Sequence, residues 1–325
     1  MNNKLNPVAK INISKANSKT GIIIKELYKN GSLYLIALPA VILLFLFNYL
    51  PLFGLIIAFK NFTFDKGIVG SDWSNPIFNN FKFLFSSEAS IRAIKNTLLL
   101  NSFFILSGIV FEVGFALALN EIKAKFFKKV TQSLTLLPFF MSWIVVGVFS
   151  YNVLTSNGSS LNLLLGAIGI PKIDFLTNAV IWPFVLMLIA RWKNTGYGSV
   201  VYLSVLSGID TTYYEAAEID GASRWQQLFR ISIPLLRPTI VIMTLLQVGR
   251  IFNADFGMFY AILNDNPMLY STTDVIDVFV YRSLRLTSDI GMASAAGFTQ
   301  SIMSFLCVIG SNALTRKLEK DSSLF

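Results

Sequence analysis

The sequence contains no histidine and only one cysteine in its 325 residues. Without histidine it lacks the commonest general base and the commonest metal ligand. Cys307 has no second cysteine for an internal disulfide, and it lies in an apolar run that is typical of a buried, unreactive thiol. We therefore expect no catalytic residue and no metal site in this chain.

Charged residues are also scarce. They make up 14% of the chain, whereas a soluble domain carries about 25%. Hydrophobic residues reach 54%, with 29 phenylalanines, and the mean hydropathy is +0.60. Such a chain cannot cover itself with polar surface in water, so the composition predicts a membrane protein.

Six apolar runs are long enough to span a bilayer, which requires about 20 mostly apolar residues each. They are Leu33–Phe59, Asn96–Leu119, Thr131–Leu154, Ala179–Leu203, Thr239–Leu263 and Met292–Ala313. The first begins too late and is too long for a cleaved signal peptide, and Pro39 and Pro51 within it predict a kink or an early end near Tyr49. The sequence therefore predicts an all-α protein with six transmembrane helices.

The distribution of lysine and arginine predicts the orientation. Segments 1–32, 120–130, 204–238 and the C-terminal tail hold 16 of these residues, and the alternating loops hold 8. The positive-inside rule places both termini in the cytoplasm. It also explains the net charge of +9 without nucleic acid as a partner. We expect a basic cytoplasmic arm at 1–32, a six-span domain at 33–318 and a cytoplasmic tail at 319–325.

Residues 210–234, named the elbow below, predict two short helices joined at a glycine corner. Asp210 and Thr212 are both candidate caps for the first helix. Thr212 and Glu215 also have the spacing of a capping box. Gly221 is placed to leave that helix in a left-handed conformation.

A second capping box opens the second helix of the elbow. It consists of Ser223 and Gln226, and we expect Pro234 and Pro238 to end this helix and lead into the fifth span. Acidic residues line the first helix beside Ala216 and Ala217. These acidic residues either cap and solvate the helix or form a docking surface for a cytoplasmic partner.

The outer segment 264–291 is apolar enough for a short helix or hairpin against the outer face of the protein. Two interpretations stay open for it. One is an interfacial aromatic anchor. The other is a gate or a docking surface for an external partner.

At the elbow the sequence resembles the permease subunits of binding-protein-dependent ABC importers. Their hallmark is Glu-Ala-Ala, three residues, Gly, about nine residues and Ile-x-Leu-Pro. Here it reads Glu215-Ala216-Ala217, then Gly221, then Ile231-Ser-Ile233-Pro234, with Ile233 in place of leucine. Stretches 49–62, 192–198 and 271–282 resemble carbohydrate permeases of the maltose-transporter type, in particular the branch for oligosaccharides released from polysaccharides.

The resemblance implies a multi-pass subunit of the bacterial plasma membrane that pairs with a second, homologous permease. Two ATP-binding subunits bind ATP and magnesium, and a lipid-anchored solute-binding protein delivers an oligosaccharide from outside. The elbow would be the coupling helix on an ATPase subunit, through Tyr214, Glu215, Ala216, Ala217, Glu218, Asp220, Gly221, Ala222, Phe229 and Pro234. No glycine is followed directly by lysine, so the chain lacks the phosphate-binding loop Gly-x4-Gly-Lys-Ser/Thr. We therefore expect no cofactor bound to it.

Polar and aromatic residues in or near the apolar runs are candidates for a sugar pathway, because such residues normally face a cavity or a partner. They are Glu112, Trp143, Trp182, Arg191, Trp192, Asn194, Tyr197, Gln247, Asn253, Asp255, Tyr260 and Gln300. Structural alternatives stay open. Arg191 and Lys193 can snorkel, Arg250 can pair with Asp255 or Glu112, and the tryptophans can be interfacial anchors.

Three other functions are weaker interpretations. A permease of the same type for another solute class has the same motifs. A self-sufficient channel or secondary transporter normally has internal repeats, and none is evident between the first and last three runs. An intramembrane enzyme requires clustered catalytic groups, which the lack of histidine makes scarce.

Overall fold

A computed structural model describes residue 26 and residues 29–154 and 159–318. The predicted arm at 1–32 and tail at 319–325 therefore lie almost entirely outside the described residues. Within the described part the fold is helical, and its only strand-like pairing is a single antiparallel bridge between Lys60 and Trp73. The chain divides into two units, up to Ile56 and from Ile57 onwards.

From Gly31 onwards, the first unit is one long helix that changes its winding. Helix α2 (Gly31–Leu44) continues as a π-helix, η2 (Phe45–Tyr49), and then as a 3₁₀-helix that runs on from Leu50 to Phe59. Pro39 lies inside α2 without ending it. The irregularity expected near Tyr49 is present as a change of helix type, and the chain stays helical through it.

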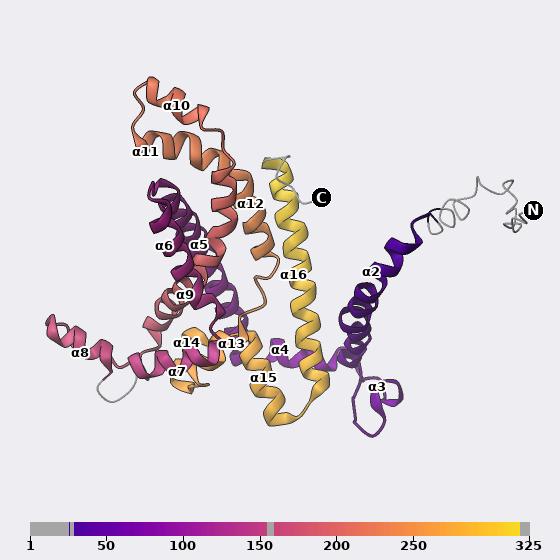
Figure 1. Ribbon diagram of the computed structural model, residues 1–325. Coiled ribbons are helices and arrows are strands. Elements are labelled where there is room, and N and C mark those ends of the chain that lie inside the picture. Colours follow the sequence, from indigo (N-terminus) through magenta and orange to yellow (C-terminus); the bar gives the residue numbers. More distant parts are fainter. Residues whose placement is uncertain (1–25, 27–28, 155–158, 319–325) are drawn as a thin grey trace, which may run out of the picture. The chain divides into compact units, whose positions relative to one another are not determined.

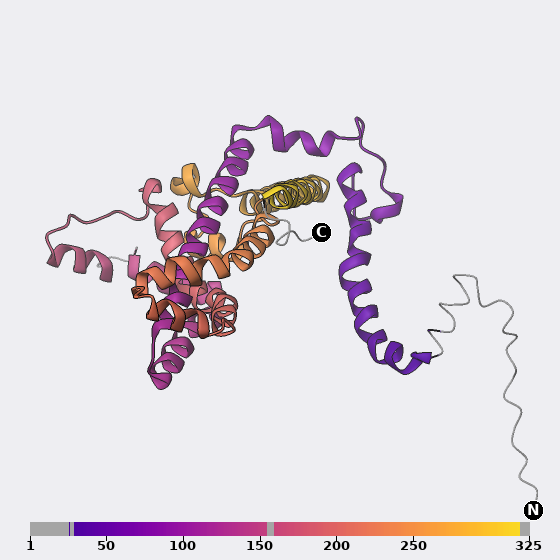
Figure 2. The ribbon, with the colours of Figure 1, turned by 90° about the horizontal axis from the view of Figure 1, so that it is seen from above.

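Long helices form the second unit and run between its two ends (Figure 1). They are α5 (Glu88–Glu121), α6 (Lys125–Leu136) with η5 (Leu137–Phe140), α9 (Trp182–Ser207), α11 (Arg224–Gln227) with η7 (Leu228–Ser232) and α12 (Ile233–Val248), and α16 (Ile290–Leu318). Figure 2 looks nearly along the axis of α16, drawn in yellow.

Short helices lie at the ends of the second unit. Helix α10 (Thr212–Ile219) and α11 lie at the end where α5 meets α6 and where α16 finishes (Figure 1). The opposite end holds α3 (Gly67–Gly70), η4 (Asn79–Phe81), α4 (Lys82–Ser86), α7 (Trp143–Leu154), α8 (Ser160–Ala167), η6 (Ala179–Ile181), α13 (Phe256–Leu263), η8 (Pro267–Leu269), α14 (Tyr270–Thr273) and α15 (Ile276–Thr287). In the second unit, the elbow and the outer segment 264–291 are thus at opposite ends, as the predicted topology requires.

Four of the described helices are long and apolar enough to cross a membrane: Gly31–Phe59, Glu88–Glu121, Arg224–Val248 and Ile290–Ala313. A bent pair, Lys125–Phe140 with Trp143–Leu154, raises the number to five. Helix α9 is 26 residues long but does not reach that apolarity, and it carries Arg191 and Lys193. The protein is therefore a multi-pass membrane protein with four or five spans by this measure.

The third apolar run was predicted as one span over Thr131–Leu154, and a single straight helix there is wrong. The chain bends by 97° between Phe140 and Trp143. Pro138 lies in the first turn of the 3₁₀-helix η5, and Met141 is extended with φ −73° and ψ 139°, so the helical hydrogen bonds stop there. Only α6 and η5 run along the bundle, and α7 crosses it.

The fifth run was predicted at Thr239–Leu263, and these bounds are also wrong. The helix extends from Arg224 to Val248, residues 249–255 are not helical, and α13 is a separate helix. Pro234 and Pro238 do not end the second helix of the elbow. Pro234 lies in the first turn of α12 after the π-helical turn η7, where its missing N–H is tolerated, and the helix continues past Pro238.

Two buried clusters hold the second unit together. At the end opposite the elbow, α5, α7, α9 and α13 pack around Val146, Leu186 and Phe259, in a cluster called the outer core below. Nearer the elbow, α5, α9 and α12 pack around Ala116, Tyr202 and Leu236. Helices α5 and α9 belong to both clusters, so α9, which leads into the elbow, is also part of the outer core.

Candidate functional site

The corner of the elbow is a Schellman motif. The N–H of Ala222 donates to the carbonyl of Ala217 at 2.8 Å, and the N–H of Gly221 donates to that of Glu218 at 3.0 Å. Gly221 has φ +76°, which is the left-handed conformation expected from the sequence. The chain therefore turns at a fixed angle after α10.

The second helix of the elbow opens with the predicted capping box. The Ser223 hydroxyl accepts from the N–H of Gln226 at 3.4 Å, and the Gln226 side chain accepts from the N–H of Ser223 at 2.7 Å. The predicted cap of the first helix is wrong in part. Thr211 occupies the N-cap position without a side-chain bond, while Asp210 accepts from the N–H of Thr212 at 2.9 Å.

Two further contacts fix the first helix of the elbow to the second. Tyr214 shares a hydrogen bond of 2.9 Å with Ser232, and Arg224 pairs with Glu218 at 2.9 Å. Because Ser232 precedes α12 directly, α10 is fastened to the base of a long apolar helix. The elbow is therefore a preformed structure.

Most of the elbow is exposed in the isolated chain. Glu215, Ala216, Glu218, Asp220 and Gly221 are all exposed. So are Pro234 and the stacked rings of Trp225 and Phe229, with 60% of Phe229 accessible, whereas Tyr214, Ala217 and Ala222 are half-buried. Seven of the ten predicted coupling residues are thus exposed, and the other three are half-buried.

Inside the bundle, Glu112 of α5 and Arg191 of α9 are brought together. Their side chains lie 3.5 Å apart, and both are nearly buried. Glycines make room for them, since a Cβ at Gly198 would overlap the Glu112 carboxylate and one at Gly108 would overlap Arg191. Arg191 therefore does not snorkel. Among the described residues, Arg250 pairs with neither Glu112 nor Asp255.

Lys193 has a different role from the snorkelling considered for it. It is only 6% exposed, and its ammonium donates to three backbone carbonyls at the bend before α7. These are the carbonyls of Pro138 at 3.2 Å, Phe139 at 2.6 Å and Met141 at 2.7 Å. Helix α9 thus holds the bend in the third apolar run.

The break between α12 and α13 is held by side chains from other helices. Asn101 of α5 donates to the carbonyls of Ile251 at 2.7 Å and Asn253 at 3.2 Å. Gln300 of α16 donates to that of Phe252 at 3.0 Å. Asp277 of α15 accepts from the N–H of Ala254 at 2.8 Å.

The two interrupted spans also meet each other. The indole N–H of Trp143, at the start of α7, donates to Asp255 at 2.7 Å, and Asp255 caps α13 through the N–H of Met258 at 3.2 Å. The Lys193 ammonium lies 5.2 Å from the centre of the Trp143 ring. Lys193, Trp143 and Asp255 are called the junction below.

The remaining candidates of the sugar pathway are dispersed. Trp182 is buried in the outer core, where it donates to the Phe175 carbonyl at 2.7 Å, so it is no interfacial anchor. Asn194 bonds to its own helix. Tyr197 stacks on Phe139 at 4.0 Å, and Tyr260 stacks on Phe256 at 5.2 Å. Trp192 (48%), Tyr197 (56%) and Asn253 are exposed, and Gln247 is half-buried.

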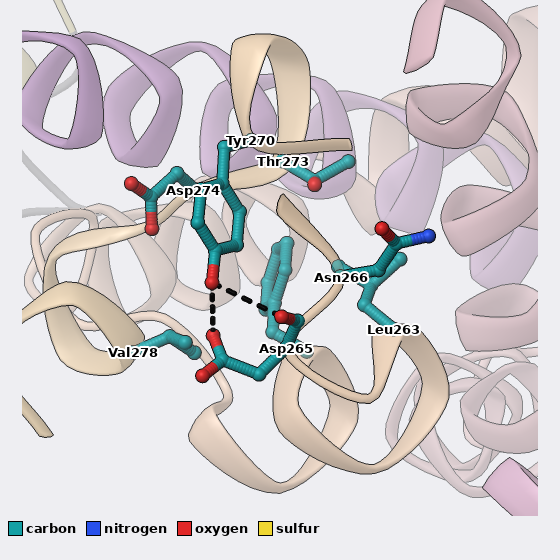
Figure 3. Close-up of a pocket in the computed structure, with 8 residues that line it drawn as sticks. Leu263, Asp265, Asn266, Tyr270, Thr273, Asp274 and Val278 are labelled. Atoms are coloured by element: carbon teal, nitrogen blue, oxygen red, sulfur yellow. Dashed lines mark hydrogen bonds between the residues drawn. The ribbon is translucent and has the colours of Figure 1, made fainter. Parts of the chain in front are cut away.

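The outer segment 264–291 contains short packed helices, so of the two structures expected for it, a short helix or a hairpin, the helix is present. Figure 3 shows the Tyr270 hydroxyl directed at Asp265, to which it donates at 2.7 Å. Arg282 pairs with Asp265 at 2.9 Å and with both oxygens of Asp274 at 3.0 Å, and it stacks 4.1 Å from the centre of the Tyr270 ring. Burial raises the pKa of Tyr270 to about 12. This cluster fixes α14 and α15 against each other.

Comparison with known proteins identifies the family. Residues 19–321 match the family described as "Binding-protein-dependent transport system inner membrane component". The chain belongs to this family. It is therefore a multi-pass subunit of the inner membrane.

Individual relatives match over most of the chain. The polygalacturonan/rhamnogalacturonan transport system permease protein YteP of Bacillus subtilis (strain 168) is 30% identical over 309 residues, 95% of each chain. The arabinooligosaccharides transport system permease protein AraP of Halalkalibacterium halodurans is 29% identical over 210 residues, 63% of this chain and 65% of AraP. A crystal structure of a bacterial alginate ABC transporter, in complex with an alginate pentasaccharide-bound periplasmic protein, contains a chain with 32% identity and a TM-score of 0.81. That match covers 91% of this chain and 98% of the other.

Proposed function

We propose that this inner-membrane subunit is the permease of an ATP-driven importer that carries oligosaccharides into the cytoplasm. The names of YteP and AraP and the alginate-bound neighbour support a sugar as cargo. The proposal includes six spans, with α9 as the fourth, and both termini in the cytoplasm. The ion pair of Arg191 with Glu112 and the buried, bonded Lys193 support this placement, because neither cation of α9 would face lipid unpaired.

The importer requires subunits that this chain does not supply. A second, homologous permease pairs with it, two ATP-binding subunits bind ATP and magnesium, and a lipid-anchored solute-binding protein presents the sugar outside. In this arrangement the chain is not an enzyme, and the partner subunits hydrolyse ATP.

The elbow is the coupling element in this proposal, through the ten residues named for it above. The observation that carries it is a folded, exposed knob joined without a break to an apolar helix over Arg224–Val248. Closure of the ATPase dimer changes the contacts of the knob. This change displaces the elbow, and a preformed corner does not absorb the displacement. The displacement therefore reaches the spans and changes the side of the membrane to which the sugar pathway opens.

The sugar pathway in this proposal lies near Glu112, Trp182, Arg191, Trp192, Asn194, Tyr197, Asn253, Asp255 and Tyr260. Among these, Trp192, Tyr197, Asn253 and Asp255 have exposed side chains. Exposed aromatic faces and hydrogen-bonding groups are the chemistry that sugars require. Glu112, Arg191 and Trp182 are buried and would act by shaping the pathway.

Gly221→Val tests the coupling role. Nothing lies within 4 Å of a Cβ at this position, so the strain comes from the backbone alone. A β-branched residue at φ +76° costs about 1–3 kcal/mol. We expect the variant to insert normally while copurification of the ATPase and sugar uptake fail.

Gly221→Asn is the matched control, because asparagine tolerates the left-handed conformation. It should retain both copurification and uptake. Normal uptake by Gly221→Val would contradict the proposal. Reaction of Glu215→Cys with an impermeant thiol reagent added outside the cell would also contradict it, because the elbow would then face outwards.

A further inference from the structure

The two helical arms that leave the elbow are joined a second time at the outer end of the core. One arm, α9, leads back to Lys193, which binds the bend before α7. The other arm, α12, leads on to Asp255, which binds Trp143 at the start of α7. The elbow, the two arms and the junction thus form a closed ring of bonded elements.

We propose that the junction fastens the two arms of the elbow into one moving unit. Lys193, Trp143 and Asp255 are positioning residues in this unit. The inference rests on the proposed coupling role of the elbow. Through the junction, a displacement of the elbow reaches α7 and α13, which pack on each other in the outer core.

The bonding of Lys193 supports positioning over sugar contact. An ammonium group has three protons to donate, and here it has three carbonyl acceptors. It is also 6% exposed, so it offers a sugar hydroxyl neither a free proton nor access. Unpaired carbonyls at membrane depth are costly, and Lys193 therefore fixes the direction of the chain where η5 ends.

Trp143 and Asp255 complete the link. The indole has a single donor, and Asp255 accepts it with one oxygen while the other caps α13. A close approach of backbones strengthens the contact of α7 with α13, since a Cβ at Gly147 would overlap the Ala261 carbonyl. Movement of one of these helices without the other would break the Trp143–Asp255 hydrogen bond and the close approach of Gly147 to Ala261.

Lys193→Met in the complete importer is the test, since methionine has a similar length and no donor. We expect normal insertion, ATPase copurification and basal ATP hydrolysis. Stimulation of ATP hydrolysis by the sugar-loaded binding protein, and uptake, should fall about tenfold. Lys193→Arg should restore part of both, because guanidinium also donates to carbonyls. Trp143→Phe removes one bond and should give a smaller loss of stimulation.

Lys172→Met is the control, because Lys172 is an exposed lysine of an outer loop, and it should behave as wild type. The proposal is overturned if Lys193→Met keeps both stimulation and uptake, or if it loses ATPase copurification. It is also overturned if Lys193→Met changes only the sugar concentration required for uptake, which would indicate direct contact. Failure of the wild-type chain to copurify an ATPase would instead refute the role of the elbow.

Discussion

The elbow and the junction are both turns between helices, but different contacts hold them. Every bond that shapes the elbow joins residues at most 18 positions apart. At the junction, Trp143 and Asp255 are 112 positions apart, and Lys193 reaches 52 to 55 positions back along the chain. The elbow is also exposed, whereas Lys193 is buried.

This difference separates what each region can do. A turn made by local bonds keeps its shape at the end of the bundle without support from the rest of the protein, which suits a docking surface. A turn made by distant side chains exists only while several helices are in place. The junction is therefore sensitive to helix packing, and the elbow to its own caps.

The largest effect is expected where α9 approaches the chain before the bend. A Cβ at Gly196 would overlap the carbonyl oxygen of Thr135. Gly196→Val forces the helices apart and should cost about 3 kcal/mol, the upper range for overpacking. The fraction of monodisperse protein in detergent and its unfolding temperature measure this. Gly297→Val is the control, since no atom lies within 4 Å of a Cβ there.

The buried pair of Glu112 and Arg191 gives an effect of similar size. Arg191→Met leaves a carboxylate buried without its partner, which costs about 3 kcal/mol. Adding Glu112→Leu should recover most of that stability, because an apolar pair needs no solvation. Thermal unfolding of the two single variants and the double variant provides the cycle. Equal instability of the double variant would refute this account, and a stable double variant that carries no sugar would place the pair in the pathway.

Ser223→Ala should weaken the elbow without changing the stability of the core. Loss of an N-cap costs about 1 kcal/mol, which is about fivefold in an equilibrium constant. We expect ATPase affinity to fall by that factor while the unfolding temperature of the whole subunit stays the same, because the elbow is exposed. Ser204→Ala is the control, since that hydroxyl bonds only to Val200 of its own helix at 2.9 Å. A lower unfolding temperature for Ser223→Ala would show that the elbow is part of the cooperative core.

The same difference explains what could be predicted from the sequence. Gly221 and the box of Ser223 and Gln226 are local signals, and both were predicted correctly. The breaks at Met141 and at 249–255 lie inside apolar runs, and their caps come from Lys193 and Asn101, far away in sequence. Hydropathy identified the runs and could not identify where they break.

The roles of single polar residues follow the same rule. Lys193 and Arg191 were noticed because they are charged residues in an apolar run, but their partners lie on other helices. Asn101 and Asp277 were missed as candidate residues, since an isolated asparagine or aspartate carries no local signal for a distant backbone group. Only Pro138, before the bend, was a sequence signal for the break in the third run.

The smallest expected effect is a pair of opposite pH dependences. In the elbow, the backbone hydrogen bond from Thr212 lowers the pKa of Asp210 below its usual 3.8. Its stabilisation is therefore present above pH 3.8 and is lost as the pH falls through the lowered value.

At the break before α13, burial raises the pKa of Asp277 above 3.8, although it accepts from the N–H of Ala254 and from Gln300. The folded protein binds this proton more tightly, so the contribution of Asp277 to stability falls as the pH rises from 3.8 through the raised value. Relative to wild type, the unfolding temperature of Asp210→Asn should fall as the pH rises towards 3.8, whereas that of Asp277→Asn should rise as the pH increases above 3.8. If both differences in unfolding temperature changed with pH in the same direction, Asp277 would be as well solvated as Asp210. The break before α13 would then be open to water.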